Sequence, residues 1–190
     1  MRLNTLLFHS SEWFFLCLKL NEYGTKHNQP TLFFLHKFSA HLYQLHGAVD
    51  KNKIIAFEQR HEVVLPADYK FFLSKTNGID FMGVTVYGIF DDTTFKSIGG
   101  SYVFEHYEAG NPMPLNLIPF SPDGAGNHYC FDSNNCTNEV CKIIFWQHDL
   151  TYDSDNPPEI VNESFAEWMK EVVIDWTLED YDYNGNRKRQ

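Results

Sequence analysis

The hydrophobic pattern changes twice along the chain, from helical spacing to strand-like alternation and back. Residues 31–46 place leucine and phenylalanine at helical spacing, and Gly47 can end such a helix in a left-handed cap. The apolar positions of 51–61 are consistent with a second, short helix. A third helix is expected from Pro66, whose missing N–H needs no partner in a first turn, and Asn77-Gly78 is a stop signal for it.

The middle of the chain is rich in β-branched and aromatic residues. Turn-forming clusters at 121–127 and 132–139 separate the apolar runs, and such short connections favour antiparallel pairing. The long, Gly-rich stretch 91–114 is interpreted as a surface excursion. We therefore expect four strands, at 83–90, 115–120, 128–132 and 141–147.

A single apolar stripe marks a C-terminal helix. Ser164 and Glu167 have the spacing of a capping box, in which each side chain bonds a free backbone N–H of the first turn. The stripe consists of Phe165, Trp168, Met169, Val172, Val173 and Trp176. We expect this stripe to face the core.

The chain has 190 residues, 43% of them hydrophobic, which suits one packed domain. We expect an N-terminal helical extension over 1–49, a folded domain over 50–178 and a polar tail over 179–190. So short an extension rarely holds a core of its own. A start site assigned too far upstream is the alternative explanation of this extension.

Compartment signals in the sequence are weak. Arg2 and the apolar run 13–18 faintly suggest a signal peptide, but polar residues 9–12 interrupt the pattern and no small-residue cleavage site follows. No stretch approaches the roughly 18 to 20 apolar residues of a membrane helix. The four cysteines form no C-x-x-C pair and fit a reducing compartment. The sequence thus predicts a cytoplasmic protein without a membrane partner.

The net charge of −10 is concentrated in one tract. Residues 149–183 hold eleven acids and one base, so this tract alone carries a charge of −10. Such a balance argues against nucleic-acid binding, which needs a basic surface. Two interpretations stay open: a solvated helix face, or an electrostatic docking surface for a basic protein.

Motifs for catalysis or metal binding are absent or weak. The sequence has no P-loop, dinucleotide fingerprint, nucleophile elbow or H-E-x-x-H. His128, Cys130, Cys136 and Cys141 lack the paired close spacing of a zinc site, and buried or loop cysteines are the simpler interpretation. His148-Asp149 lacks a nucleophile or third group. We therefore expect no cofactor, no metal and no enzymatic activity.

A series of short motifs resembles the SUKH superfamily, which includes the yeast cell-wall glucan-synthesis regulator and many bacterial toxin-immunity proteins. The first motif is E-x6-LP-x2-Y-x2-F-L-x3-NG, beginning at Glu58. It is followed by LIPF (117–120), GAGNHYCFD (124–132), IIFWQHD (143–149) and SFAEW (164–168). The similarity covers about residues 50–176, and the order of the motifs is more specific than any one of them.

The resemblance implies an α+β fold with a central, mostly antiparallel sheet flanked by helices. It implies structural roles for the shared positions Leu65, Pro66, Tyr69, Phe72, Asn77, Gly78, Gly126, Trp146 and Phe165. It also implies a small intracellular protein that binds and neutralises a cognate toxin, often a nuclease, without catalysis or cofactor. The alternative is an intracellular interaction or regulatory module of the kind found among the eukaryotic relatives.

The resemblance and the acidic tract together nominate the residues that contact a basic toxin. Asp132 matches a recurrent aspartate after a sheet strand, and either a turn cap or a partner contact would explain it. The remaining candidates are Asp149, Asp153, Asp155, Glu159, Glu163, Glu167 and Glu171, which a nuclease inhibitor could present in place of phosphates.

Overall fold

Two antiparallel sheets form the centre of the molecule in the computed structural model, which describes residues 35–90, 94 and 96–189. The first sheet has the order β1 (Tyr43–Leu45), β2 (Ile79–Phe81), β3 (Val84–Val86). The second has the order β4 (Leu117–Pro122), β5 (His128–Thr137), β6 (Val140–Trp146), β7 (Glu159–Asn162). Hydrogen bonds from Tyr87 N–H to the Phe120 carbonyl and from Ser121 Oγ to the Thr85 carbonyl join the sheets at β3 and β4.

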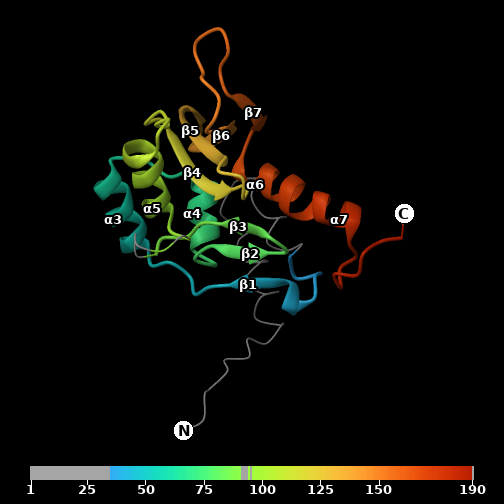
Figure 1. Ribbon diagram of the computed structural model, residues 1–190. Coiled ribbons are helices and arrows are strands. Elements are labelled where there is room, and N and C mark those ends of the chain that lie inside the picture. The colour runs from blue at the N-terminus through green and yellow to red at the C-terminus, as the bar shows by residue number, and fades with distance from the viewer. Residues whose placement is uncertain (1–34, 91–93, 95, 190) are drawn as a thin grey trace.

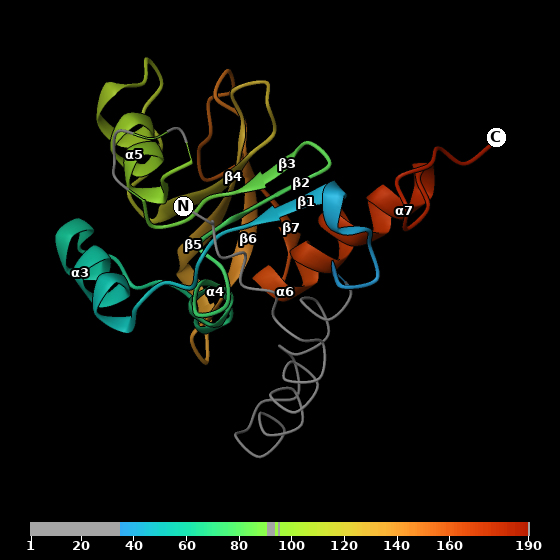
Figure 2. The same ribbon diagram turned by 90° about the horizontal axis from the view of Figure 1, so that it is seen from below.

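The helices lie at both ends of the sheets. In both views, α3 (Lys51–His61) and α5 (Ile98–Val103) lie at one end, and α7 (Trp176–Asp180) leads away at the other (Figures 1 and 2). The π-helical segment η3 (Phe104–Glu108) extends α5. At the C-terminal end, the π-helical segment η4 (Met169–Asp175) joins α6 (Phe165–Trp168) to α7. The remaining elements are η2 (Ala40–Leu42) and α4 (Ala67–Leu73).

Aromatic side chains from α4, the second sheet and α6 form the centre of the core. Phe120 lies with its ring centroid 4.3 Å from that of Phe131 and 4.8 Å from that of Trp168. Tyr69 is fully buried, and its hydroxyl donates a 2.6 Å hydrogen bond to the Tyr87 carbonyl. Burial of such rings supplies most of the hydrophobic stabilisation, and the Tyr69 hydroxyl finds an acceptor directly after β3 that fixes the ring.

The α+β class and the mostly antiparallel sheet expected from the sequence are confirmed. The expected helix over 51–61 is also present, with Asp50 as its N-cap. The apolar stripe of the last helix faces the core from Phe165 to Val173, whereas Trp176 is 49% exposed. The expected strands match β3 to β6 in order, although β3 is shorter and β5 is longer than predicted.

The helix expected over 31–46 does not continue beyond Leu35, the first residue that the structure describes. Leu35 and Phe38 are buried as the pattern suggested, but Tyr43–Leu45 form β1, which pairs with β2. Residues 31–34, like the possible signal sequence over 1–20, lie outside the described part of the chain. Apolar spacing located two buried positions, but Leu45 is exposed. Pairing with β2, which the sequence did not reveal, decided the conformation.

The surface excursion expected over 91–114 is also wrong, because α5 and η3 lie within it. Ser97 caps α5 by accepting from Gly100 N–H, and Ile98 and Tyr102 are buried. Two glycines at 99–100 disguise the helix in the sequence, since glycine has a poor helix propensity.

Candidate functional site

The acidic tract, residues 149–183, is distributed over the β6–β7 connection, β7 and the C-terminal helix. Figure 1 shows the connection as a long loop that projects beyond the sheet. Asp149, Asp153 and Asp155 belong to this loop, and Glu159 begins β7. Glu163 precedes α6, and the remaining acids of the tract follow it along the C-terminal helix and at its end. The tract therefore offers two acidic regions, one on a loop and one along a helix.

Several of the predicted contact residues already bond within the chain. Glu167 accepts from the Glu163 N–H at 2.9 Å, one residue earlier than the capping box predicts, while Ser164 Oγ accepts from Glu167 N–H as expected. Glu171 accepts from the Asn162 amide at 2.7 Å. Glu163 pairs with Lys142 at 3.2 Å on the surface. A charge reversal at these three glutamates would therefore disturb the helix start as well as the surface charge.

Other acids of the tract are available to a partner. One carboxylate oxygen of Asp153 accepts hydrogen bonds from the N–H groups of Asp155 and Asn156, which shapes the loop. Within the part of the chain that the structure describes, the carboxylates of Asp149, Asp155 and Glu159 have neither a hydrogen bond nor an ion pair. They are exposed, so a partner can approach them without breaking an internal contact.

Asp132 lies where the pairing of β5 with β6 is interrupted, and it organises the chain at this irregularity. Its side chain is buried and accepts hydrogen bonds from the Asn116 amide at 2.8 Å, the Asn134 N–H at 3.0 Å and the Asn135 amide at 2.6 Å. Three donors satisfy both oxygens of the carboxylate. The sequence left two roles open for Asp132, a turn cap or a partner contact, and these hydrogen bonds are those of a turn cap.

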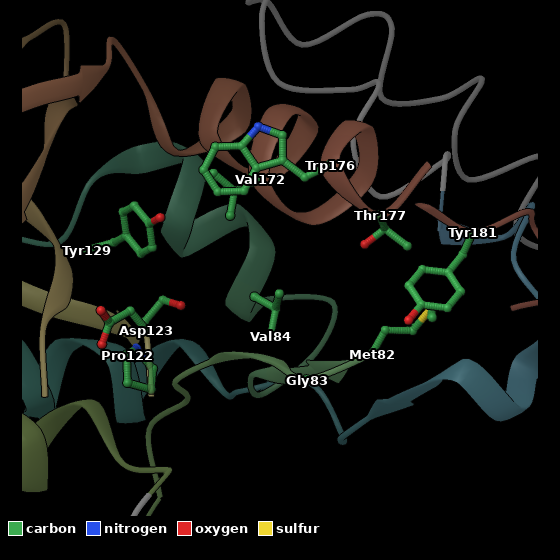
Figure 3. A pocket seen from close by; sticks show the side chains of 11 residues that line it. Met82, Gly83, Val84, Pro122, Asp123, Tyr129, Val172, Trp176, Thr177 and Tyr181 are labelled. Atoms are coloured by element: carbon green, nitrogen blue, oxygen red, sulfur yellow. The ribbon is translucent and has the colours of Figure 1, made fainter. Parts of the chain in front are cut away.

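A groove lies between the C-terminal helix and the turn that joins β2 to β3. It encloses a volume of about 320 Å³. In Figure 3, Val172 and Trp176 of the helix face Val84 across the groove, with Tyr129 and Asp123 toward one end and Met82 toward the other. The remaining lining residues are Gly83, Ser121, Pro122, Thr177 and Tyr181. We refer to this feature as the groove.

The electrostatic environment of the groove is negative. Burial, followed by the charges of Asp123 and Glu171, raises the pKa of the Tyr129 hydroxyl. Burial opposes ionisation of Asp123, but hydrogen bonds from Ala125 N–H and from Asn127 lower its pKa on balance, so Asp123 is ionised at neutral pH. Two carboxylates therefore act on the same aromatic end of the groove.

A buried polar cluster lies under η3. His128 Nδ1 is 3.8 Å from Glu105 Oε1, and His128 Nε2 is 3.4 Å from the Tyr87 hydroxyl. Burial raises the pKa of Glu105 and lowers the pKa of His128 to about 4. Among the described residues, His128 Nδ1 has no hydrogen-bond partner. The side chains of Glu105 and His128 are both buried, and burial opposes the charged form of each.

The cysteines and His148, which the sequence analysis considered for metal binding or catalysis, do not form a common site. Cys136 and Cys141, which face each other across the β5–β6 hairpin, form a disulfide, and Cys130 is a buried free thiol. The expectation of four reduced cysteines is therefore wrong for this pair, because the hairpin register, which the sequence does not reveal, places the two residues opposite each other. His148 Nδ1 lies 2.9 Å from Asn127 Oδ1, so the histidine is engaged by that turn. The described residues contain no group of three potential metal ligands.

Most of the motif residues lie in the hydrophobic cores or at the end of a helix. Leu65, Tyr69, Phe72 and Phe165 belong to the main core, and Pro66 is the N-cap of α4. Trp146 lies in a second, smaller core with Met113, Leu117, Cys130 and Ile144. The three remaining motif residues, Asn77, Gly78 and Gly126, lie outside both cores.

These last three residues shape turns. Gly78 has a φ of +81°, and a Cβ there would lie 2.7 Å from a carbonyl oxygen of β3. Asn77 bonds both the N–H and the carbonyl of Ile89, so it ties α4 to the chain beyond β3. Gly126 has a φ of +96° and packs against the His148 ring.

Residues 48–171 match the family described as SMI1 / KNR4 (SUKH-1), which is more than half of the chain. The chain belongs to the SMI1/KNR4 family. The resemblance seen in the sequence motifs is thereby confirmed. β1 and Leu35 lie before the matched segment of this SMI1/KNR4 chain, yet β1 pairs with β2 and Leu35 is part of the core.

A solved structure supports the fold of this SMI1/KNR4 chain. The crystal structure of a protein from Pseudomonas syringae pv. tomato is similar with a TM-score of 0.52 and 15% identity, over 85% of this chain and 98% of that chain. No curated protein matches the sequence. Among the described residues, no helix is long and apolar enough to cross a membrane.

Sequence reasoning missed the groove. Its walls come from the β2–β3 turn, the β4–β5 hairpin and the C-terminal helix, which are distant in sequence. One signal was available: an acid directly precedes two lining residues of the helix and the residue that follows it, in Glu171-Val172, Asp175-Trp176 and Asp180-Tyr181. Apolar positions flanked by acids on an otherwise core-facing stripe are compatible with a partly exposed aromatic surface.

Proposed function

We propose that this chain is a non-enzymatic intracellular immunity protein, which binds and neutralises a basic protein toxin through its acidic tract near the C-terminus. The observation that carries the proposal is the tract of eleven acids and one base over residues 149–183. Exposed carboxylates without internal partners, those of Asp149, Asp155 and Glu159, are suitable contacts for lysine and arginine. Family membership supports a protein-binding role of this kind.

A nuclease is the toxin class that fits the charge best. A nuclease must attract the phosphates of its substrate with basic side chains. An inhibitor that presents carboxylates competes for the same surface, and opposite charges raise the association rate. Charges that gain most from this effect are exposed and unpaired, as these loop acids are.

The first experiment tests protection. The toxin candidate is the C-terminal domain of a secreted protein encoded beside this chain, expressed in a bacterial host with or without the chain. We expect survival only with co-expression. If the chain gives no protection and does not bind the domain, the immunity function is wrong, and the alternative of a regulatory interaction module gains support.

A matched pair of variants then tests the role of the acids. D155K/E159K reverses two unpaired acids of the tract, and E62K/E139K reverses two exposed acids elsewhere. Both change the net charge from −10 to −6, so their general effect on steering is equal. We expect the tract variant to bind the toxin domain at least tenfold more weakly than the control variant, which corresponds to about 1.4 kcal/mol. Equal affinities would place the binding surface outside the loop.

A further inference from the structure

We propose that the groove is a receptor for one arginine side chain, presented by the basic protein partner. This inference rests on the proposed function for the identity of the partner, but the chemistry of the groove can be tested without it. The occupant is specified by three features of the groove: apolar walls, aromatic faces and flanking carboxylates.

The apolar walls suit the stem of a long side chain. Val84 of β3 and Val172 of η4 face each other across the groove, and Met82 lies toward one end (Figure 3). Methylene groups buried here would be stabilised by leaving water. Long cationic side chains bury their stems against apolar surface in this way and keep the charged head near a polar end.

The aromatic faces suit the cationic head. Trp176 is 49% exposed although it belongs to the stripe that otherwise faces the core. Tyr129 of β5 lines the groove as well and is half-buried. A guanidinium over an indole or phenol ring is attracted by the electrons of the ring, and the attraction grows when water is excluded. Tryptophan and tyrosine are also the residues that most often anchor protein interfaces.

The charge of the groove selects a cation. Asp123 is the only ionised side chain among the eleven lining residues, all of which the structure describes, and none of the eleven is basic. Glu171 acts on the Tyr129 hydroxyl from the helix side. The neighbouring base on the helix, Lys170, is paired with Asp175. A positive head group at Tyr129 would therefore lie beside the Asp123 carboxylate, with the negative charge of Glu171 nearby, and would meet no base within the lining.

Arginine fits this combination better than lysine. Its planar guanidinium can stack on an aromatic ring and still donate hydrogen bonds in its own plane to a carboxylate. An ammonium group is more strongly hydrated and loses more on entering a partly apolar groove. The groove thus discriminates by shape as well as by charge.

The probe is N-acetyl-arginine methylamide, titrated against the full chain, with the citrulline analogue as an uncharged control of nearly the same shape. The Trp176 indole N–H resonance, assigned by its loss in W176F, is the readout. We expect a saturable shift with the arginine probe, at least fivefold weaker binding of the lysine analogue, and at least tenfold weaker binding of the citrulline analogue. Equal binding of arginine and citrulline, or no saturable shift with arginine, would overturn the inference.

Two variants locate the binding energy. E171Q retains an oxygen that can accept from Asn162, so we expect it to fold normally and to weaken arginine binding several-fold. W176A should abolish saturable binding, followed through other groove resonances such as the Thr177 methyl group. Y107A removes an aromatic side chain that is 66% exposed outside the groove, so it is the matched control and should bind arginine unchanged. An unchanged affinity in both W176A and E171Q would contradict the assignment.

The outcomes separate this inference from the proposed function. If W176A binds the toxin domain as tightly as the unaltered chain, while D155K/E159K does not, the groove inference fails and the immunity function stands. If the arginine probe binds the groove but no toxin domain is neutralised, the proposed function fails and the groove remains an arginine receptor.

Discussion

Burial of His128 makes the stability of the protein depend on pH. The imidazole lies between Glu105 and Tyr87 and is shielded from solvent, which lowers its pKa from 6.5 to about 4. The charge of Asp123 opposes this shift and that of His148 adds to it, but burial dominates. In the unfolded chain the same imidazole takes up a proton near pH 6.5.

The sign and size follow from proton linkage. The unfolded state binds the proton more readily, so the stabilisation is complete above pH 6.5 and is lost as the pH falls from 6.5 toward 4. With these two pKa values, His128 alone should remove about 2 kcal/mol of the free energy of unfolding between pH 7 and pH 5. The raised pKa of Glu105 acts in the opposite direction, because its protonation at low pH favours the folded state.

The assay is urea unfolding, followed by circular dichroism at pH 7 and pH 5, for the unaltered chain and for H128Q. Glutamine is neutral at both pH values, and the titration of groups outside the cluster cancels when the two proteins are compared. We expect the loss of stability between pH 7 and pH 5 to be about 2 kcal/mol larger for the unaltered chain.

A charged pair would give the opposite result. If the Glu105 carboxylate held His128 protonated across the 3.8 Å that separates them, the unaltered chain would lose no more stability than H128Q on acidification. That outcome would refute the conclusion that desolvation outweighs the attraction between the two groups.

Three further substitutions test the structure itself, each by urea unfolding. W168A removes a fully buried ring and should cost about 3–5 kcal/mol, and a cost under 1 kcal/mol would contradict its central place in the core. C136S/C141S opens a bridge with a sequence separation of 5 and should cost about 2 kcal/mol; a reductant should destabilise the unaltered chain but not this variant. G78A should cost about 1–3 kcal/mol because φ is +81°, whereas G47A has open space and should be nearly neutral; equal costs would refute the steric argument.

The sequence predicts most strongly those elements whose local pattern agrees with their environment. The C-terminal helix has both a cap at Ser164 and an apolar stripe, and both are present. β1 could not be predicted, because Tyr43–Leu45 becomes a strand only by pairing with Ile79–Phe81. Single-sequence periodicity contains no information about such a distant partner.

The candidate site was predictable in its charge and not in its geometry. The acidic tract is visible in the sequence, but the internal bonds of Glu167 and Glu171 are not. The groove combines Asp123, Tyr129 and Trp176 from separate elements, so only the folded chain reveals it. The disulfide between Cys136 and Cys141 likewise depends on the register of the β5–β6 hairpin.

The most direct test of the account is the association rate constant with the toxin domain, measured by stopped flow from low to high ionic strength. We expect fast association at low salt that slows steeply as salt screens the charges, and a clearly weaker salt dependence for D155K/E159K than for the equally charged E62K/E139K. Identical salt dependence for both variants, or a rate that does not respond to salt, would contradict the claim that the acidic tract docks the partner.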